Sequence, residues 1–110
     1  MKNNIEIFTD TLNLIRENDT LKKSLENSIK NQKIILESDT YTEKDIQTTE
    51  IQNTTKIITK HSSMNAARAY AGRGRTAVLN FASPTHAGGL VLQGASSQEE
   101  CLCRVSTLYK

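Results

Sequence analysis

The sequence predicts an α/β fold, in which helices pack against a sheet of parallel strands. Apolar residues recur every three or four positions in the N-terminal part, as they do along one face of a helix. Three short apolar runs further along have the length of strands, and a glycine-containing loop follows the last of them. The expected order is helix, helix, strand, strand, helix, strand, helix, which is typical of sheets whose strands are joined by crossover helices.

Two amphipathic helices are expected at the N-terminus. The first covers roughly residues 3–17, and Asn18, Asp19 and Thr20 then interrupt it and offer side chains that can cap the second. The apolar stripes consist of Ile5, Phe8, Leu12 and Ile15 in the first helix and of Leu21, Leu25 and Ile29 in the second. These stripes predict that one face of each helix packs against the rest of the protein.

The strand candidates lie at residues 33–37, 56–59 and 77–82. The polar stretch 38–53, which separates the first two, predicts an irregular connection or a weak strand. A third helix is expected over residues 64–70, because this segment is rich in alanine, the best helix former. Ser62 can cap its start, and Gly72 follows its end.

The last strand candidate leads into a loop and a helix start. Pro84 ends the strand, because proline cannot donate to a sheet ladder. A loop that contains Gly88 and Gly89 follows, and residues 96–100 then lead into a helix-like run at 101–105. Glycines let backbone approach a ligand, and a helix start offers unpaired N–H groups, so this arrangement predicts an anion-binding site.

Four short motifs stand in this region in one order: Asn80-Phe81-Ala82-Ser83-Pro84, Ala87-Gly88-Gly89, Gln98-Glu99-Glu100 and Ser106-Thr107-Leu108-Tyr109. Together they resemble the microbial-type poly(ADP-ribose) glycohydrolases, macrodomain-like enzymes that cut the ribose–ribose bond of ADP-ribose polymers. That family carries a triple glycine, a spacer and Gln-Glu-Glu, and here Leu90 occupies the third glycine position. The resemblance implies a macrodomain-like three-layer α/β/α architecture.

The two glutamates carry the implied chemistry. The resemblance makes Glu100 the general acid and Glu99 the residue that grips ribose hydroxyls. Protonating the departing oxygen stabilises an oxocarbenium-like transition state, so the pKa of Glu100 is expected to be raised by burial or by a like charge. The alternative is that both are ordinary acids of a first helical turn, where the helix dipole favours them.

The resemblance gives five substrate-binding candidates: Gly88, Gly89, Gln98, Asn80 and Ser83. The glycines would bring loop N–H groups to the diphosphate. The asparagine and serine would line the ribose pocket, and the glutamine would orient the glutamates or the substrate. Each also has a plainer reading as part of a turn or a helix start. Leu90 would be strained if its position requires a positive φ.

Composition limits the function classes. The chain has 110 residues, 36% of them hydrophobic, which suffices for one small domain with a thin core. A net charge of +2 gives no reason to expect direct nucleic-acid binding, and no apolar run is long enough to cross a bilayer. Cys101 and Cys103 diverge on a helix, and reduced thiols fit the cytoplasm. We therefore expect a cytoplasmic protein, and no metal or cofactor is implied.

The sequence leaves two function classes open. One is an ADP-ribosyl glycohydrolase that acts on poly(ADP-ribose), and the other is an ADP-ribose-binding module or inactive remnant that does not cleave it. The expected division is a helical segment over residues 1–32 and the first part of a macrodomain-like catalytic domain over residues 33–110. Because members of the resembling family are longer, we expect an N-terminal portion with an incomplete sheet and weak or absent activity.

Overall fold

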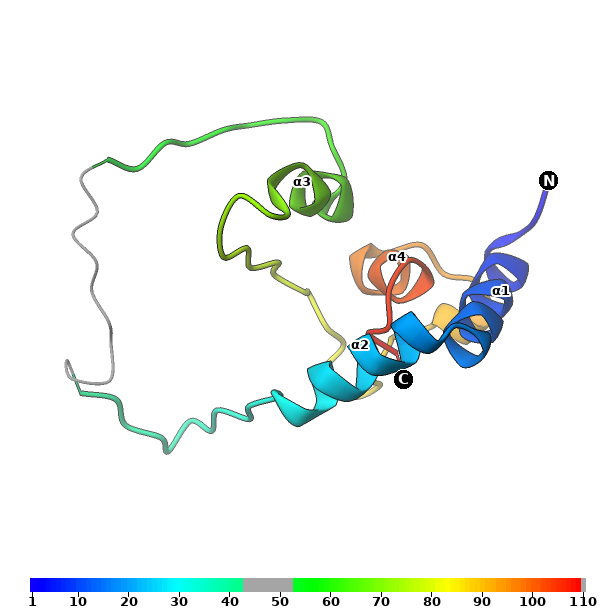
Figure 1. The fold of residues 1–110 in the computed structure, drawn as a ribbon, viewed down its shortest axis with the longest axis horizontal. Helices are drawn as coiled ribbons and strands as arrows, with labels where there is room; N and C mark the ends of the chain where they lie inside the picture. The colour runs from blue at the N-terminus through cyan, green and yellow to red at the C-terminus, as the bar shows by residue number, and fades with distance from the viewer. Residues whose placement is uncertain (43–52, 110) are drawn as a thin grey trace.

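The computed structural model describes residues 1–42 and 53–109. Over these residues the chain forms four α-helices and one short 3-10 helix (Figure 1). The elements are α1 (Asn4–Glu17), α2 (Asp19–Lys30), α3 (Ser63–Tyr70), η2 (Val91–Gln93) and α4 (Gln98–Arg104). None of these helices is both long and apolar enough to span a membrane.

The prediction of an α/β fold is wrong for the described part of the chain, which contains helices and no strand or sheet. The macrodomain-like three-layer architecture is overturned with it. The runs at 33–37, 56–59 and 77–82 are instead coil or turn, and their apolar side chains are exposed, among them Ile58 at 98% and Phe81 at 73%. A strand is stabilised by neighbouring strands and by burial of its faces, and these runs have neither. Most of the stretch 38–53 lies outside the described residues.

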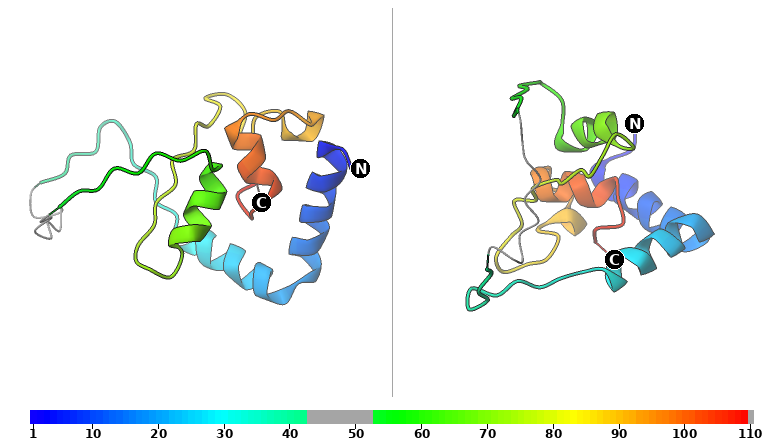
Figure 2. Two further views of the ribbon diagram at one scale, coloured as in Figure 1. Left: turned by 90° about the horizontal axis from the view of Figure 1, so that it is seen from above. Right: turned by 60° about the vertical axis from the view of Figure 1, so that its left-hand side comes forward.

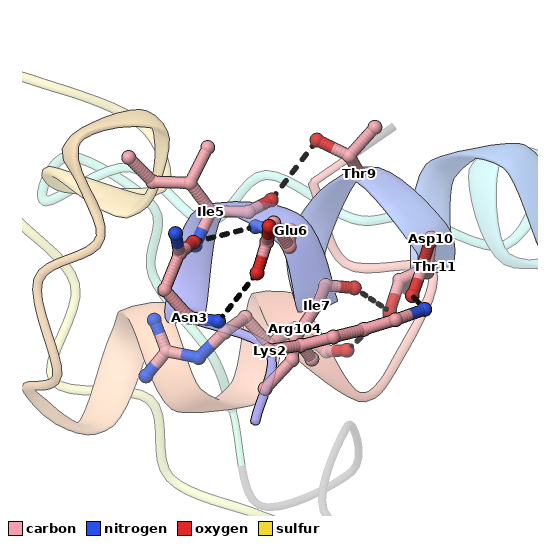
Figure 3. A network of polar contacts seen from close by, with 9 residues as sticks. All are labelled: Lys2, Asn3, Ile5, Glu6, Ile7, Thr9, Asp10, Thr11 and Arg104. Atoms are coloured by element: carbon pink, nitrogen blue, oxygen red, sulfur yellow. Dashed lines mark hydrogen bonds and ion pairs between the residues drawn. The ribbon is translucent and has the colours of Figure 1, made fainter.

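Helix α1 begins where its sequence predicts. The side chain of Asn3 accepts hydrogen bonds from the backbone N–H groups of Ile5 and Glu6, at 3.0 and 2.9 Å. Glu6 returns the interaction by accepting from the backbone N–H of Asn3 at 2.7 Å, which completes a capping box (Figure 3). Each of these bonds satisfies an N–H group that the helix itself leaves without a partner.

A single asparagine ends α1 and starts α2. The backbone N–H of Asn18 donates to Leu14 at the end of α1, and its side chain accepts from the N–H of Leu21 in α2. The two helices therefore meet at a corner, as Figure 2 shows. Helix α2 buries none of its residues fully, although Leu21 and Leu25 are half-buried. The amphipathic pattern predicts this helix correctly, but it does not predict that so little of the apolar face is buried.

Helix α3 stands apart from the helical pair α1–α2 (Figure 1). The side chain of Ser62 caps its start by accepting from the N–H of Asn65, as expected. Gly72, with a φ of 81°, follows the end of the helix in the left-handed region that glycine adopts most easily. A hydrogen bond between Ser63 and Gln98 joins α3 to α4.

The core is small and lies between α1, η2 and the C-terminal segment. Phe8, Val91 and Cys103 form a buried cluster, and Tyr109 packs against it. The rings of Phe8 and Tyr109 meet edge to face, with their centroids 5.0 Å apart. The core therefore joins the first helix to the last residues that the structure describes. The division at residues 32 and 33 stays a prediction.

Two hydrogen bonds fix α1 against the C-terminal elements. The side-chain amide of Asn4 donates to the carbonyl of Gly94 at 2.8 Å. The hydroxyl of Thr11 donates to the carbonyl of Arg104, at the end of α4, at 2.6 Å (Figure 3). Because both acceptors lie at the ends of short helices, these bonds also satisfy carbonyls that the helices leave free.

We expect Phe8→Ala to destabilise the protein by about 3 kcal/mol or more, because it removes a fully buried ring and leaves a cavity in a core with few other members. Chemical denaturation monitored by circular dichroism measures the change. Leu14→Ala is the matched control, because Leu14 is exposed on the same helix, and it should cost within about 0.5 kcal/mol. Equal effects of the two variants would contradict this description of the core.

Candidate active site

The first turn of α4 carries the Gln-Glu-Glu motif and faces the preceding loop. Ser97 is the N-cap residue of this helix, but its side chain makes no capping hydrogen bond. Glu99 and Glu100 are both buried, each at 6% exposure. A carboxylate is costly to bury unless donors surround it, so the partners of these two side chains decide what the site is.

Glu99 holds two points of the loop at once. One of its carboxylate oxygens accepts from the backbone N–H of Ser83 at 2.7 Å, and the other accepts from the backbone N–H of Gly88 at 2.8 Å. The segment after Pro84 is thereby drawn back toward α4. Each oxygen keeps a second lone pair for another donor.

Glu100 is held at one oxygen and left without a partner at the other. Its Oε1 accepts from the backbone N–H of Leu90 at 3.0 Å. Its Oε2 is buried and makes no hydrogen bond within the described chain. A buried carboxylate oxygen in this state is ready to receive a hydrogen bond or a proton.

The pKa of Glu100 is lowered from its ordinary value. The N–H of Leu90 contributes most, followed by the residue's own N–H, and the positive charge of Arg104 adds to the effect. Burial opposes these contributions but does not outweigh them. The expectation of a raised pKa is therefore wrong for the chain without ligand, because it considered burial and like charge but not the loop N–H donor.

The two glycines allow the loop to lie directly on its neighbours. Gly88 and Gly89 have φ values of 81° and 57°, in the left-handed region. A side chain at Gly88 would overlap the ring of Tyr109, and one at Gly89 would overlap the carboxylate of Glu100. Glycine is therefore required here by the protein's own packing.

The N–H groups of the glycine loop are already bonded within the protein. Gly88 donates to Glu99, Gly89 donates to the carbonyl of His86 at 2.9 Å, and Leu90 donates to Glu100. The role of Gly88 and Gly89 at a diphosphate consequently stays a prediction, and it requires these N–H groups to exchange partners or to be shared.

Leu90 fits its position without strain. Its φ is −105° and its ψ is 33°, and no residue other than glycine has a positive φ among the described residues. Half of its surface is exposed, at 50%. The condition for strain at the third glycine position is therefore not met, because within residues 88–90 only the two glycines have a positive φ. A Leu90→Gly substitution therefore has no strain to relieve.

A pocket of about 440 Å³ opens beside Glu99. Of the residues predicted from the sequence, it is lined by Asn80, Ser83, Gly88 and Glu99, whereas Gly89, Gln98 and Glu100 do not line it. The Oδ1 atom of Asn80 is buried and has no hydrogen-bond partner within the described chain. A larger cavity of about 840 Å³, beside α3 and α4, contains neither glutamate.

Several residues that the sequence did not indicate as site residues also line the pocket, among them His86, Cys103 and Tyr109. Cys103 lies one helical turn after Glu99, a spacing that puts both on one face of a helix and could have indicated its place. Its thiol is free, like that of Cys101, and its pKa is raised by burial and by the charges of Glu99 and Glu100. No group of three or more metal-binding side chains occurs in the described ranges.

Gln98 points away from the pocket and toward backbone. Its side-chain amide bonds to the carbonyl of Leu79 and to the N–H of Phe81, both at 2.7 Å. The same amide reaches the hydroxyl of Ser63 in α3 at 3.1 Å. The three side chains of the motif therefore bind two different segments. The glutamine binds the backbone of residues 79–81, and the glutamates bind N–H groups of the glycine loop.

A family model for the microbial-type PARG catalytic domain matches residues 5–110 of this chain. The chain belongs to this family. The match confirms the resemblance seen in the motifs and includes α1, which those motifs do not contain. For a member of the PARG family, a hydrolase acting on poly(ADP-ribose) is the activity that membership suggests. Comparisons with curated proteins and with solved structures found no match.

We expect Gly89→Ala to destabilise this PARG-family chain more than Gly72→Ala does, by about 1 kcal/mol or more. Both glycines have a positive φ, but only at Gly89 would the new methyl group displace the carboxylate of Glu100 and break its bond to Leu90. The space around Gly72 is open. Unfolding free energies of the two variants measure the difference, and equal costs would contradict the close approach.

The lowered pKa of Glu100 predicts a pH-dependent contribution to stability. Since the folded pKa lies below the ordinary value of 4.5, the contribution is present above that pH and is lost as the pH falls through the folded value. The melting-temperature gap between the wild type and Glu100→Gln should therefore be largest near neutral pH and shrink below pH 4.5. Thermal scans of both chains at a series of pH values test this, and a constant gap would contradict it.

Proposed function

We propose that this chain acts in the hydrolysis of ribose–ribose O-glycosidic bonds of poly(ADP-ribose). The observation that carries the proposal is the pair of adjacent buried carboxylates, Glu99 and Glu100, which are held by loop N–H groups. Glu99 also lines a pocket. The pocket volume of about 440 Å³ falls within the range of small-molecule sites. Family membership supplies the substrate class.

Glu100 is the proposed general acid. The bond from Leu90 fixes the direction of its carboxyl group and leaves Oε2 to carry the proton that the departing oxygen needs. Because the pKa is lowered in the free chain, the polymer has to raise it on binding. Its diphosphate brings negative charge and its bulk excludes water, and both changes favour the protonated carboxyl group.

Glu99 is the proposed ribose-binding residue. Its carboxylate lines the pocket, and each oxygen has one lone pair left after accepting from the loop. Two neighbouring ribose hydroxyls could donate to these lone pairs. Asn80 and Ser83 lie in the same pocket and complete the proposed ribose contacts, with the unpaired Oδ1 of Asn80 as an acceptor.

The second candidate function is binding of ADP-ribose without cleavage. Two observations favour it: the lowered pKa of Glu100, which disfavours the acid form, and the loop N–H groups that are already bonded to the protein. In this case Glu100 serves as a structural acceptor for the loop. The cytoplasm as the place of action stays a prediction in either case.

We expect Glu100→Gln to lower the release of ADP-ribose from poly(ADP-ribose) at least about a hundredfold, because an amide keeps the shape of the side chain but cannot donate the acid proton. Binding of ADP-ribose should stay within about threefold of the wild type, since the amide oxygen can still accept from Leu90. Single-turnover assays with excess protein and calorimetric titrations measure the two quantities.

Glu26→Gln is the control, because Glu26 is exposed on α2 and outside the site. It should change neither quantity. Release by Glu100→Gln within a few-fold of the wild type would remove Glu100 from the acid role. ADP-ribose binding by a wild-type chain that releases none would instead support the binding module.

A further inference from the structure

The side-chain amide of Gln98 has no hydrogen left for a substrate. Its Nε2 group carries two hydrogens, and two acceptors use them: the carbonyl of Leu79 and the hydroxyl of Ser63. Its Oε1 accepts from the N–H of Phe81. Turning the amide over would place like groups against each other at both backbone contacts, so the partners fix its orientation.

The two backbone groups that Gln98 binds, the carbonyl of Leu79 and the N–H of Phe81, lie two residues apart, as they would along one edge of an extended chain. In such a chain the groups of residues i and i+2 point to the same side, and a neighbouring strand would normally bind them. Among the described residues, the backbone of residues 79–81 makes no hydrogen bond to another backbone group. The glutamine amide thus takes the place of a neighbouring strand at Leu79 and Phe81.

Side chains in an extended segment alternate between two faces, and those at 79–81 do so here. Leu79 and Phe81 line a cavity beside α3. Asn80, between them, lines the pocket that contains Glu99, with its Oδ1 buried and unpaired. Binding the backbone on both sides of Asn80 therefore fixes which face of the segment this side chain occupies.

We propose that Gln98 is a positioning residue, which holds the segment 79–81 against α4 and thereby presents Asn80 to the pocket. The inference replaces the substrate contact expected from the sequence. It rests on the proposed function only where Asn80 meets ADP-ribose, and the hold on the segment stands independently of any ligand.

Three variants separate the parts of this arrangement. Gln98→Glu keeps an oxygen for the N–H of Phe81 but loses both donated hydrogens, and Gln98→Met keeps the length of the side chain but loses every hydrogen bond. Gln93→Met is the matched control, because Gln93 is exposed in η2 and its side chain makes no hydrogen bond to any residue that the structure describes. All three are studied in the full chain by amide hydrogen exchange and by titration with ADP-ribose.

The hydrogen-exchange rate of the Phe81 amide measures how stably Gln98 binds this N–H group, and it does not depend on any ligand. We expect it to rise about tenfold or more in Gln98→Met and to stay near the wild-type rate in Gln93→Met. It should also rise in Gln98→Glu, because the second carboxylate oxygen would face the carbonyl oxygen of Leu79. Wild-type exchange as fast as that of Gln98→Met would overturn the proposal, because the N–H of Phe81 would then have no stable acceptor.

A double-mutant cycle with Asn80 separates positioning from general support of the fold. Gln98→Met should weaken ADP-ribose binding about tenfold in the wild-type background but within about twofold in the Asn80→Ala background. Equal losses in both backgrounds would overturn the route through Asn80. A wild-type chain that binds no ADP-ribose would contradict the proposed function, and the exchange of Phe81 would then still decide whether Gln98 holds the segment.

Discussion

Hydrogen bonds from loop backbone to two carboxylates hold the site together. The loop that contains the N–H groups of Ser83, Gly88 and Leu90 has no sheet to support it, and buried N–H groups need acceptors. Glu99 and Glu100 are buried, and buried carboxylates need donors. Each set therefore satisfies the other, and losing either set would leave buried polar groups of the other without partners.

This arrangement requires that other elements hold α4 in place, because α4 has only about two turns. Helix α1 does so through the packing of the Phe8 ring and through the hydrogen bonds that Asn4 and Thr11 donate. The ring of Tyr109 connects α1 to the glycine loop, since it packs against Phe8 and also lies close to Gly88. Distance from the glutamates in sequence thus says little about influence on the site.

Local signals in the sequence predicted the helices well. The side chains of Asn3, Asn18 and Ser62 cap N–H groups that lie two or three residues away, so a short window of sequence contains the whole interaction. The strands were predicted by the same local reasoning, but a strand depends on partners far away in the chain. The apolar run at 77–82 has the composition of a strand and lies instead as coil.

The sequence predicted which residues form the site better than it predicted the hydrogen bonds that these residues make. The resemblance to the family assigned Asn80, Ser83, Gly88 and Glu99 to one site, and all four line the pocket, whereas the other assigned residues do not. The direction of the Glu100 pKa and the use of Gln98 could not be predicted, because each depends on which backbone groups fold back onto α4. The backbone conformation of Leu90 could not be predicted for a related reason: a φ angle follows from the turn as a whole and not from a position in a motif.

The ties between α1 and the C-terminal elements have a kinetic consequence. The bond from Asn4 to Gly94 spans 90 residues and that from Thr11 to Arg104 spans 93, so each forms only after both distant segments have been synthesised. Closing so long a loop costs entropy before any contact compensates for it. During synthesis on a ribosome, α1 would be made well before η2 and α4, so the ring of Phe8 would stay uncovered until Val91, Cys103 and Tyr109 have followed.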